Sequence, residues 1–143
     1  MCKLGDIIVI NKYISEDEKE ISKHSFIVVN DKPGFIEGLQ YDLIANVMSS
    51  FKNEEQRMKK LKFQENVEIL SKNIISNLPV NKKGGFVKAN QLFYFDKSKI
   101  DYYVLGHIDE ELLDELTMII VSLSNKGLLK QITSNLKAYQ EQI

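Results

Sequence analysis

The sequence contains a small set of side chains suited to chemistry on a phosphate group. His24 opens the apolar run HSFIVVN, and the run YDLIANVM ends directly before Ser49-Ser50-Phe51-Lys52. Histidine titrates near neutrality, so it can act as an acid, a base or a phosphate partner. Serine hydroxyls and a lysine ammonium can hold phosphate oxygens and stabilise the charge that develops on them. Groups of these kinds can transfer a proton and stabilise negative charge.

Each of these residues also has a structural interpretation. His24 stands where a loop meets a strand, a common place for a surface histidine with no chemical role. Ser50 can be the N-cap of a helix that follows it, and this role is compatible with phosphate binding. The second histidine, His107, lies in the link to a C-terminal helix, where packing or capping is the favoured interpretation.

A second group of residues could bind a nucleic-acid backbone. Lys88 and Asn90 are two positions apart in FVKANQ, so they are predicted to share one face of a strand, with Gln91 on the other. The pair Lys82-Lys83 could attract phosphates or could simply be a solvated surface. The same alternatives apply to three lysines of a polar segment, Lys59, Lys60 and Lys62.

Bulk properties limit the classes of protein that the chain can be. It has 143 residues, 43% hydrophobic and 27% charged, which is ordinary for one globular domain spanning 1–143. The formal net charge of -1 means that any nucleic-acid surface must be a local basic patch. Cys2 is the only cysteine, so an internal disulfide and a thiolate metal cluster are both excluded, which favours a reducing compartment.

Several other protein classes find no support in the sequence. No apolar run approaches the roughly 20 residues that span a bilayer, and the N-terminal MCKLGDIIVINK is predicted to be a strand rather than a signal peptide. The sequence contains no P-loop, no metal-ligand spacing and no GxSxG motif. We therefore expect a cytoplasmic protein with no membrane contact, no cofactor and no metal ion.

Runs of β-branched and aromatic residues predict a mainly β fold with helices towards the C-terminus. Strands are expected at 4–12, 24–30, 41–48, 67–70, 86–95 and 102–105, and the four longest should form one bent antiparallel sheet. Polar stretches predict a loop or a helical turn at 14–23, a turn at 30–34, a surface helix at 50–66 and a loop at 71–83. Asp109 is expected to cap a helix at 110–123 that packs on the sheet through Leu112, Leu116, Ile119 and Leu123.

A further helix is predicted after a break at Asn125-Lys126-Gly127. Its apolar residues are spaced by three and four positions, as on a narrow helical seam: Leu129, Ile132, Leu136, Tyr139 and Ile143. Such a seam is too apolar to remain exposed, so it should pack on the rest of the domain or on a second chain.

Three segments, in fixed order, resemble the MazF/PemK-like toxin superfamily. Gly5-Asp6-Ile7-Ile8 is similar to its opening strand, and HSFIVVND occupies the place of its second strand. The third segment, FVKANQLFYFDKSKI followed by LGHIDEELLDEL, resembles the strand that leads into the C-terminal helix. The resemblance covers 4–50 and 84–123, and leaves outside it an insertion at about 51–83 and an extra C-terminal helix at about 125–143.

The resemblance implies both a fold and an activity. The fold would be α+β, an SH3-like antiparallel β-barrel of the MazF/PemK/CcdB type with C-terminal helices, commonly a homodimer. The activity would be metal-independent, sequence-specific cleavage of single-stranded RNA. A protein of this kind is the toxin of a toxin–antitoxin system and is held in check by a cognate antitoxin, either a protein or an RNA.

The resemblance also implies a catalytic set. His24 stands where the family has a catalytic arginine, and Ser25 replaces the proline that follows it. Ser49, Ser50 and Lys52 resemble the T-S-x-K of the related ToxN-like branch, with serine in place of threonine. These residues, together with His24, would carry out the reaction.

RNA binding would fall to a second set. Lys88 and Asn90 occupy the place of an Arg-x-Asp in plasmid-borne relatives, where Lys88 keeps the positive charge and Asn90 cannot exchange a proton. Lys82 and Lys83 would add attraction for the backbone. Two other functions stay open, because fold does not fix function: a barrel that binds RNA or antitoxin without cutting, and a gyrase-poisoning toxin that acts on a protein.

Overall fold

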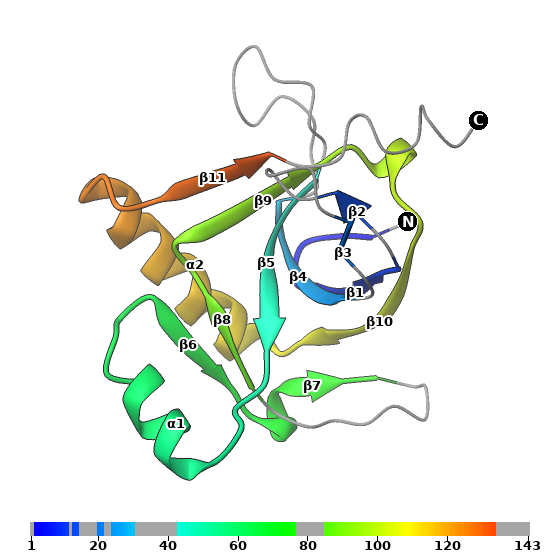
Figure 1. Cartoon of the computed structure of the whole chain (residues 1–143). Coiled ribbons are helices and arrows are strands. Elements are labelled where there is room, and N and C mark those ends of the chain that lie inside the picture. The colour runs from blue at the N-terminus through cyan, green and yellow to red at the C-terminus, as the bar shows by residue number, and fades with distance from the viewer. Residues whose placement is uncertain are drawn as a thin grey trace.

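A computed structural model describes residues 2–11, 13–14, 20–21, 24–30, 43–76 and 85–133 of the chain. Figure 1 shows how its elements follow one another. The strands are β1 (Asp6–Ile10), β2 (Tyr13–Ile14), β3 (Glu20–Ile21), β4 (His24–Asn30), β5 (Leu43–Ser49), β6 (Asn66–Ile69), β7 (Ile74–Ile75), β8 (Gly85–Lys88), β9 (Gln91–Phe95), β10 (Tyr102–Ile108) and β11 (Lys130–Thr133). The helices are α1 (Glu54–Lys60) and α2 (Glu110–Asn125), and short 3₁₀ helices occupy Ser71–Asn73 and Lys97–Lys99.

One large sheet dominates the described part of the chain. Its strands lie in the order β11-β9-β5-β4-β1-β10-β7, and β8 pairs with both β5 and β6. The pairing of β11 with β9 is parallel, whereas the other described pairings are antiparallel. The antiparallel sheet predicted from the four longest apolar runs is therefore confirmed.

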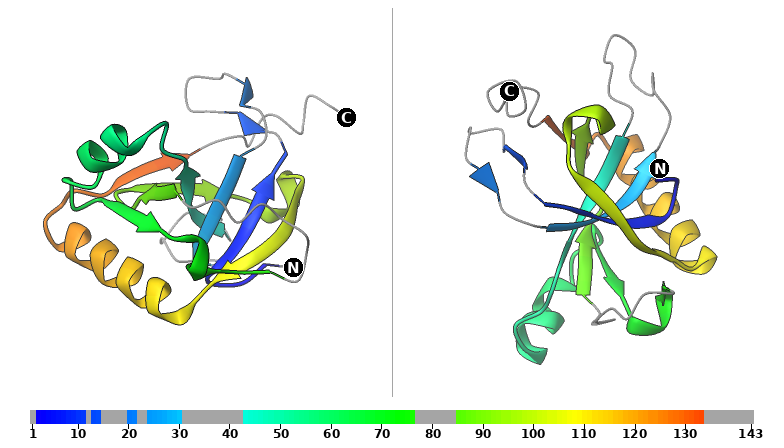
Figure 2. Two further views of the ribbon diagram at one scale, coloured as in Figure 1. Left: turned by 90° about the horizontal axis from the view of Figure 1, so that it is seen from below. Right: turned by 90° about the vertical axis from the view of Figure 1, so that its right-hand side faces the viewer.

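The sheet is curled, and one of its faces holds an apolar cluster. Ile8, Phe26, Ala45 and Phe95, from β1, β4, β5 and β9, are all buried there, and Val104 of β10 packs against them. The rings of Phe26 and Phe95 meet edge to face with their centroids 5.3 Å apart. These strands are consecutive in the sheet order, and the sheet bends around the cluster that they share, as the two views in Figure 2 show.

Helix α2 covers the opposite face of the sheet. Leu112, Leu116 and Leu123 are buried in a second cluster together with Ile7 of β1 and Ile27 of β4. These three leucines belong to the stripe predicted from the sequence, so its packing against the sheet is confirmed. No helix among the described residues is long and apolar enough to cross a membrane.

Both ends of α2 are fixed by local hydrogen bonds. Asp109 is the N-cap: its Oδ1 accepts from the Leu112 N–H, and its Oδ2 accepts from the Asn73 side chain, each at 2.9 Å. At the other end Gly127 has a φ of 69°, and the Leu128 N–H donates to the Leu123 carbonyl at 2.9 Å. This is a Schellman ending, in which glycine takes the left-handed position without steric cost.

The strand predicted at 86–95 is two strands. β8 ends at Lys88, β9 begins at Gln91, and Ala89-Asn90 form a turn between them. The expected alternation of side chains therefore does not run through FVKANQ, and the assignment of Lys88 and Gln91 to opposite faces is wrong, as the register shows below.

The helix predicted after Gly127 is also wrong in its described part. Residues 130–133 form β11, which pairs with β9 in the register Lys130↔Gln91 and Ile132↔Phe93. Backbone hydrogen bonding to an available sheet edge overrides helical spacing in so short a segment. Leu129 packs against the core as expected of the seam, whereas Leu136, Tyr139 and Ile143 lie outside the described residues.

Two polar segments contain strands that were not predicted, and a third is less helical than predicted. Within the expected loop at 14–23, Ile14 and Glu20–Ile21 are strand residues of the β2–β3 pair. The expected loop at 71–83 contains β7, which pairs with β10. The helix expected at 50–66 is only α1, and its N-cap is Asn53 rather than Ser50, because the Asn53 side chain accepts from the Gln56 N–H at 2.8 Å. The turn expected at 30–34 lies outside the described residues beyond Asn30.

We expect Asp109→Ala to lower the free energy of unfolding at neutral pH by about 1 kcal/mol, because the N-cap is lost. The Asn73 amide, and then the Leu112 N–H, hold the pKa of Asp109 below its ordinary value. A lowered folded-state pKa stabilises the protein above the unfolded-state pKa, and this stabilisation is lost as the pH falls through the folded-state pKa. The difference between wild type and variant in urea unfolding should therefore shrink in acid.

The control is Asp114→Ala, which changes an exposed acid of the same helix. A loss of stability in Asp109→Ala that stays constant into acid would contradict this account.

Candidate functional site

His24 and Ser49 lie at the neighbouring ends of two paired strands. β4 begins at His24 and β5 ends at Ser49. The two strands are antiparallel, with Phe26 opposite Val47. His24 is two residues before Phe26 and Ser49 is two residues after Val47, so strand alternation puts both side chains on the same face at the same end. His24 is exposed and Ser49 is half-buried.

The chain leaves β5 along a tightly packed path. Ser49 pairs with Phe86 of β8, and a Cβ on Gly85 would lie 2.1 Å from the Ser49 carbonyl oxygen, so only glycine permits this approach. Ser50 and Lys52 are exposed. The backbone N–H of Lys52 donates to the Gln56 side chain at 2.6 Å, which ties the residue to the first turn of α1.

A buried amide accommodates the turn between β8 and β9. Asn46 of β5 is 0% exposed, and its Nδ2 donates to the carbonyl oxygens of Gln91 at 2.8 Å and Lys88 at 3.3 Å. The Ala89 N–H donates to the Glu65 carbonyl at 2.7 Å. These bonds hold the interruption of the ladder in one conformation.

The turn changes which side chains share a face. β5 pairs with β8 through Ser49↔Phe86 and with β9 through Ala45↔Phe93. Ser49 and Ala45 are four residues apart on β5, so their partners lie on one face. Lys88 follows Phe86 by two residues and Gln91 precedes Phe93 by two, so both belong to that face as well. Lys88 is also a diagonal neighbour of Ser49.

A cleft of about 230 Å³ opens on this part of the surface. One wall comes from the end of α1 and the loop that follows it, and the other comes from the β8–β9 turn. Its lining contains two cations, one acid, one aromatic ring and three amides: Lys60, Lys88, Glu65, Phe63, Asn66, Asn90 and Gln91. The cleft therefore combines positive charge, a ring face and hydrogen-bonding groups.

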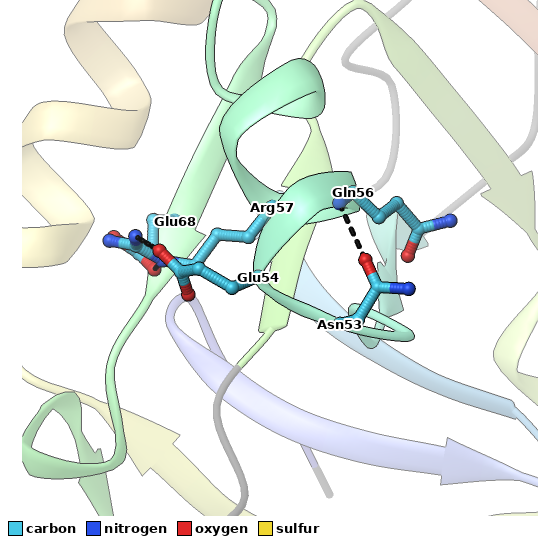
Figure 3. Close-up of polar contacts among 5 residues, drawn as sticks. All are labelled: Asn53, Glu54, Gln56, Arg57 and Glu68. Atoms are coloured by element: carbon cyan, nitrogen blue, oxygen red, sulfur yellow. Dashed lines mark hydrogen bonds and ion pairs between the residues drawn. The ribbon is translucent and has the colours of Figure 1, made fainter.

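An ion-pair fork anchors α1 to the sheet. Arg57 donates from Nε and Nη2 to the two carboxylate oxygens of Glu68 on β6, at 2.6 and 2.9 Å, and from Nη1 to Glu54 at 2.9 Å. Figure 3 shows the arginine side chain extended from the helix towards Glu68. Planar bidentate geometry fixes direction as well as distance. The same bonds raise the pKa of Arg57 above its ordinary value.

The structure brings some of the predicted site residues together. For the other predicted catalytic residues, Ser50 and Lys52, it shows that both are exposed. His24, Ser49 and Lys88 share one face on the adjacent strands β4, β5 and β8, whereas Lys88 and Asn90 line the cleft. Lys82 and Lys83 lie outside the described residues. Among the described residues, no group of three or more histidines, cysteines or acids is arranged to hold a metal ion.

Four residues of this region are not predicted from the sequence: Asn46, Phe63, Glu65 and Asn66. Asn46 gave no signal, because an asparagine inside an apolar run is not distinctive. Phe63, Glu65 and Asn66 fall within the segment predicted as a surface helix at 50–66, where no motif marks them. Lys60 belonged to a lysine group, of which Lys59 and Lys62 do not line the cleft.

Comparison of the sequence with models of protein families and with curated proteins finds no match.

We expect Asn46→Ala to lower the free energy of unfolding by about 1–3 kcal/mol, because two carbonyls at the β8–β9 turn lose their donor. Urea unfolding measures this loss. The control is Asn11→Ala, since the Asn11 side chain bonds Asp101 at the exposed surface and should contribute much less. Equal losses in the two variants would show that the turn does not depend on Asn46.

We expect Arg57→Lys to speed hydrogen exchange at the amides of α1 and to leave those of β1 unchanged. Lysine keeps the charge and cannot form the fork with Glu68. The matched control is Lys59→Gln, which removes the 3.4 Å ion pair between two highly exposed side chains, Lys59 and Glu55. If α1 exchanges at the wild-type rate in Arg57→Lys, the fork does not anchor the helix.

Proposed function

We propose that the chain is a metal-independent endoribonuclease that cuts single-stranded RNA. The observation that carries this proposal is the pairing of β4 with β5, which puts His24 and Ser49 on one face at the same end of two adjacent strands. A proton-transfer group and a hydroxyl donor are thereby available to a single phosphodiester. Lys88, diagonal to Ser49 on β8, adds positive charge on that face.

The reaction follows from these groups. The ribose 2′-oxygen forms a bond to phosphorus while the bond from phosphorus to the 5′-oxygen breaks, which leaves a 2′,3′-cyclic phosphate and a 5′-hydroxyl. His24 handles the transferred proton. Ser49, Ser50 and Lys52 donate to the non-bridging phosphate oxygens, whose charge grows in the transition state.

The biological assignment extends the sequence resemblance. Under this assignment, the curled sheet is an SH3-like barrel of the MazF/PemK type. The chain acts in the cytoplasm as a homodimeric toxin under the control of a cognate antitoxin. The resemblance at 4–50 and 84–123 supports this assignment, and so does the agreement between the predicted and observed positions of β4, β5 and α2.

A second function, RNA binding without cleavage, is favoured by the cleft. Its amides and ring can hold RNA, and Asn90 cannot act as an acid or a base. In this case the same surface would bind an RNA strand and release it uncut.

We expect His24→Ala to reduce RNA cleavage by about 10²–10⁴-fold, the usual effect of removing a general acid or base. The assay uses purified protein in excess chelator and single-stranded RNA. RNA with a 2′-deoxyribose at the cut position should resist cleavage, because it lacks the nucleophile.

His107→Ala is the control, since His107 is an exposed histidine on β10. Full activity in His24→Ala would refute the assigned role. A wild-type protein that binds RNA and cuts none would replace the nuclease with the binding function.

A further inference from the structure

The cleft between α1 and the β8–β9 turn has a feature that packing does not explain. Phe63 remains 58% exposed at its wall, although the apolar clusters lie close in the chain at Val67 and Ile69. An exposed ring beside cationic side chains is the arrangement on which unpaired bases stack. Lys60 and Lys88 supply the cations, and Glu65 is the only acid among the lining residues.

The amides of the cleft are available to different degrees. Asn66 is committed on one side, because its Nδ2 donates to the Lys60 carbonyl at 2.7 Å. The Asn90 side chain makes no hydrogen bond to a described residue, and its buried Oδ1 has no partner there. An amide carries both donors and an acceptor, so rotation of Asn90 can present either to the edge of a base.

The walls of the cleft are set before any ligand arrives. The Ala89 N–H bonds the Glu65 carbonyl at 2.7 Å, which joins the two walls directly, and the Lys130 N–H bonds the Asn90 carbonyl at 2.7 Å. Such preorganisation reduces the conformational entropy lost on binding. A volume of about 230 Å³ is below that of typical sites for drug-sized ligands, so it suits one planar ring.

We infer that this cleft is a subsite for one unpaired base of the RNA strand, with Phe63 stacking on the base, Asn90 contacting its edge, and Lys60 and Lys88 holding the adjoining phosphates. The inference rests on the proposed function for the choice of RNA. It assigns base stacking and one phosphate contact to the segment that carries Lys60 and Phe63, which lies outside the residues that resemble the toxin family.

The test measures binding apart from cleavage. The probes are short single-stranded oligodeoxynucleotides of each base, which the 2′-hydroxyl reaction cannot cut. Fluorescence anisotropy with the full chain should show that Phe63→Leu weakens binding by about 5- to 150-fold, the range expected for one lost stacking contact. Met58→Leu is the matched control: Met58 is a similarly exposed apolar residue of α1 that does not line the cleft.

Salt dependence tests the phosphate contacts. Lys60→Gln should reduce the slope of log K against log salt by about 0.7, the value for one phosphate contact to a single strand. Lys59→Gln removes an equivalent charge from α1 outside the cleft and should keep the wild-type slope. A duplex of the same sequence should bind more weakly than the single strand, because its bases are already stacked.

The outcomes separate the subsite from the nuclease. Wild-type affinity in both Phe63→Leu and Lys60→Gln, or no binding of any single strand, would overturn the subsite even if the protein cuts RNA. Binding that depends on Phe63 in a protein that cuts no RNA would support the subsite and refute the nuclease. Circular dichroism of each variant should match wild type, since Phe63 and Lys60 are not part of the buried core.

Discussion

The sheet depends on one buried amide at the position where β5 changes partners. β5 pairs with β9 near its start and with β8 near its end, so its ladder must be interrupted between them. Asn46 stands at this interruption and donates to the carbonyls of Lys88 and Gln91. An apolar residue of similar size would leave these acceptors without this donor, and unpaired buried acceptors are costly. The amide thus takes the place of ladder bonds that the turn removes.

This local solution has consequences for both sides of the sheet. The turn at Ala89-Asn90 directs Lys88 and Gln91 to the same face, where they meet the segment after α1. It also lets β8 and β9 follow different directions from one continuous β5, so that β6 can extend the sheet beside β8 while β11 extends it beside β9. The cleft opens beside this turn, against the end of α1 and the loop that follows it.

The sequence correctly predicts the elements that nearby residues determine. It mispredicts the elements whose conformation depends on a partner distant in the sequence. The β-branched runs around Ile8 and Val28 are sufficient for β1 and β4, and Asp109 with its leucine stripe is sufficient for α2. FVKANQLFYF has no glycine or proline to announce a break, so the turn at Ala89 is visible only once Asn46 and Glu65 are in place. Ile132 fits a helix and a strand equally well, and the free edge of β9 selects the strand. For the site, His24 and Ser49 were found through motif resemblance, whereas Phe63 and Asn66 lie where no motif exists.

The candidate site combines residues on the strands of the sheet with residues on helix α1 and the loop after it. His24, Ser49 and Lys88 are borne on strands of the sheet, so their spacing is set by backbone hydrogen bonds around a buried core. Helix α1 has no buried residue. Two contacts join it to β6: the half-exposed Arg57–Glu68 pair, which salt screens, and the hydrogen bond from the Asn66 side chain to the Lys60 carbonyl. The side chains of Lys60 and Phe63 lie outside the buried core, so they can be exchanged without disturbing the strands that carry His24, Ser49 and Lys88. In the proposed enzyme, base stacking on Phe63 depends on the least buried part of the fold, where substitutions cost little stability, and bond cleavage resides in the most constrained part.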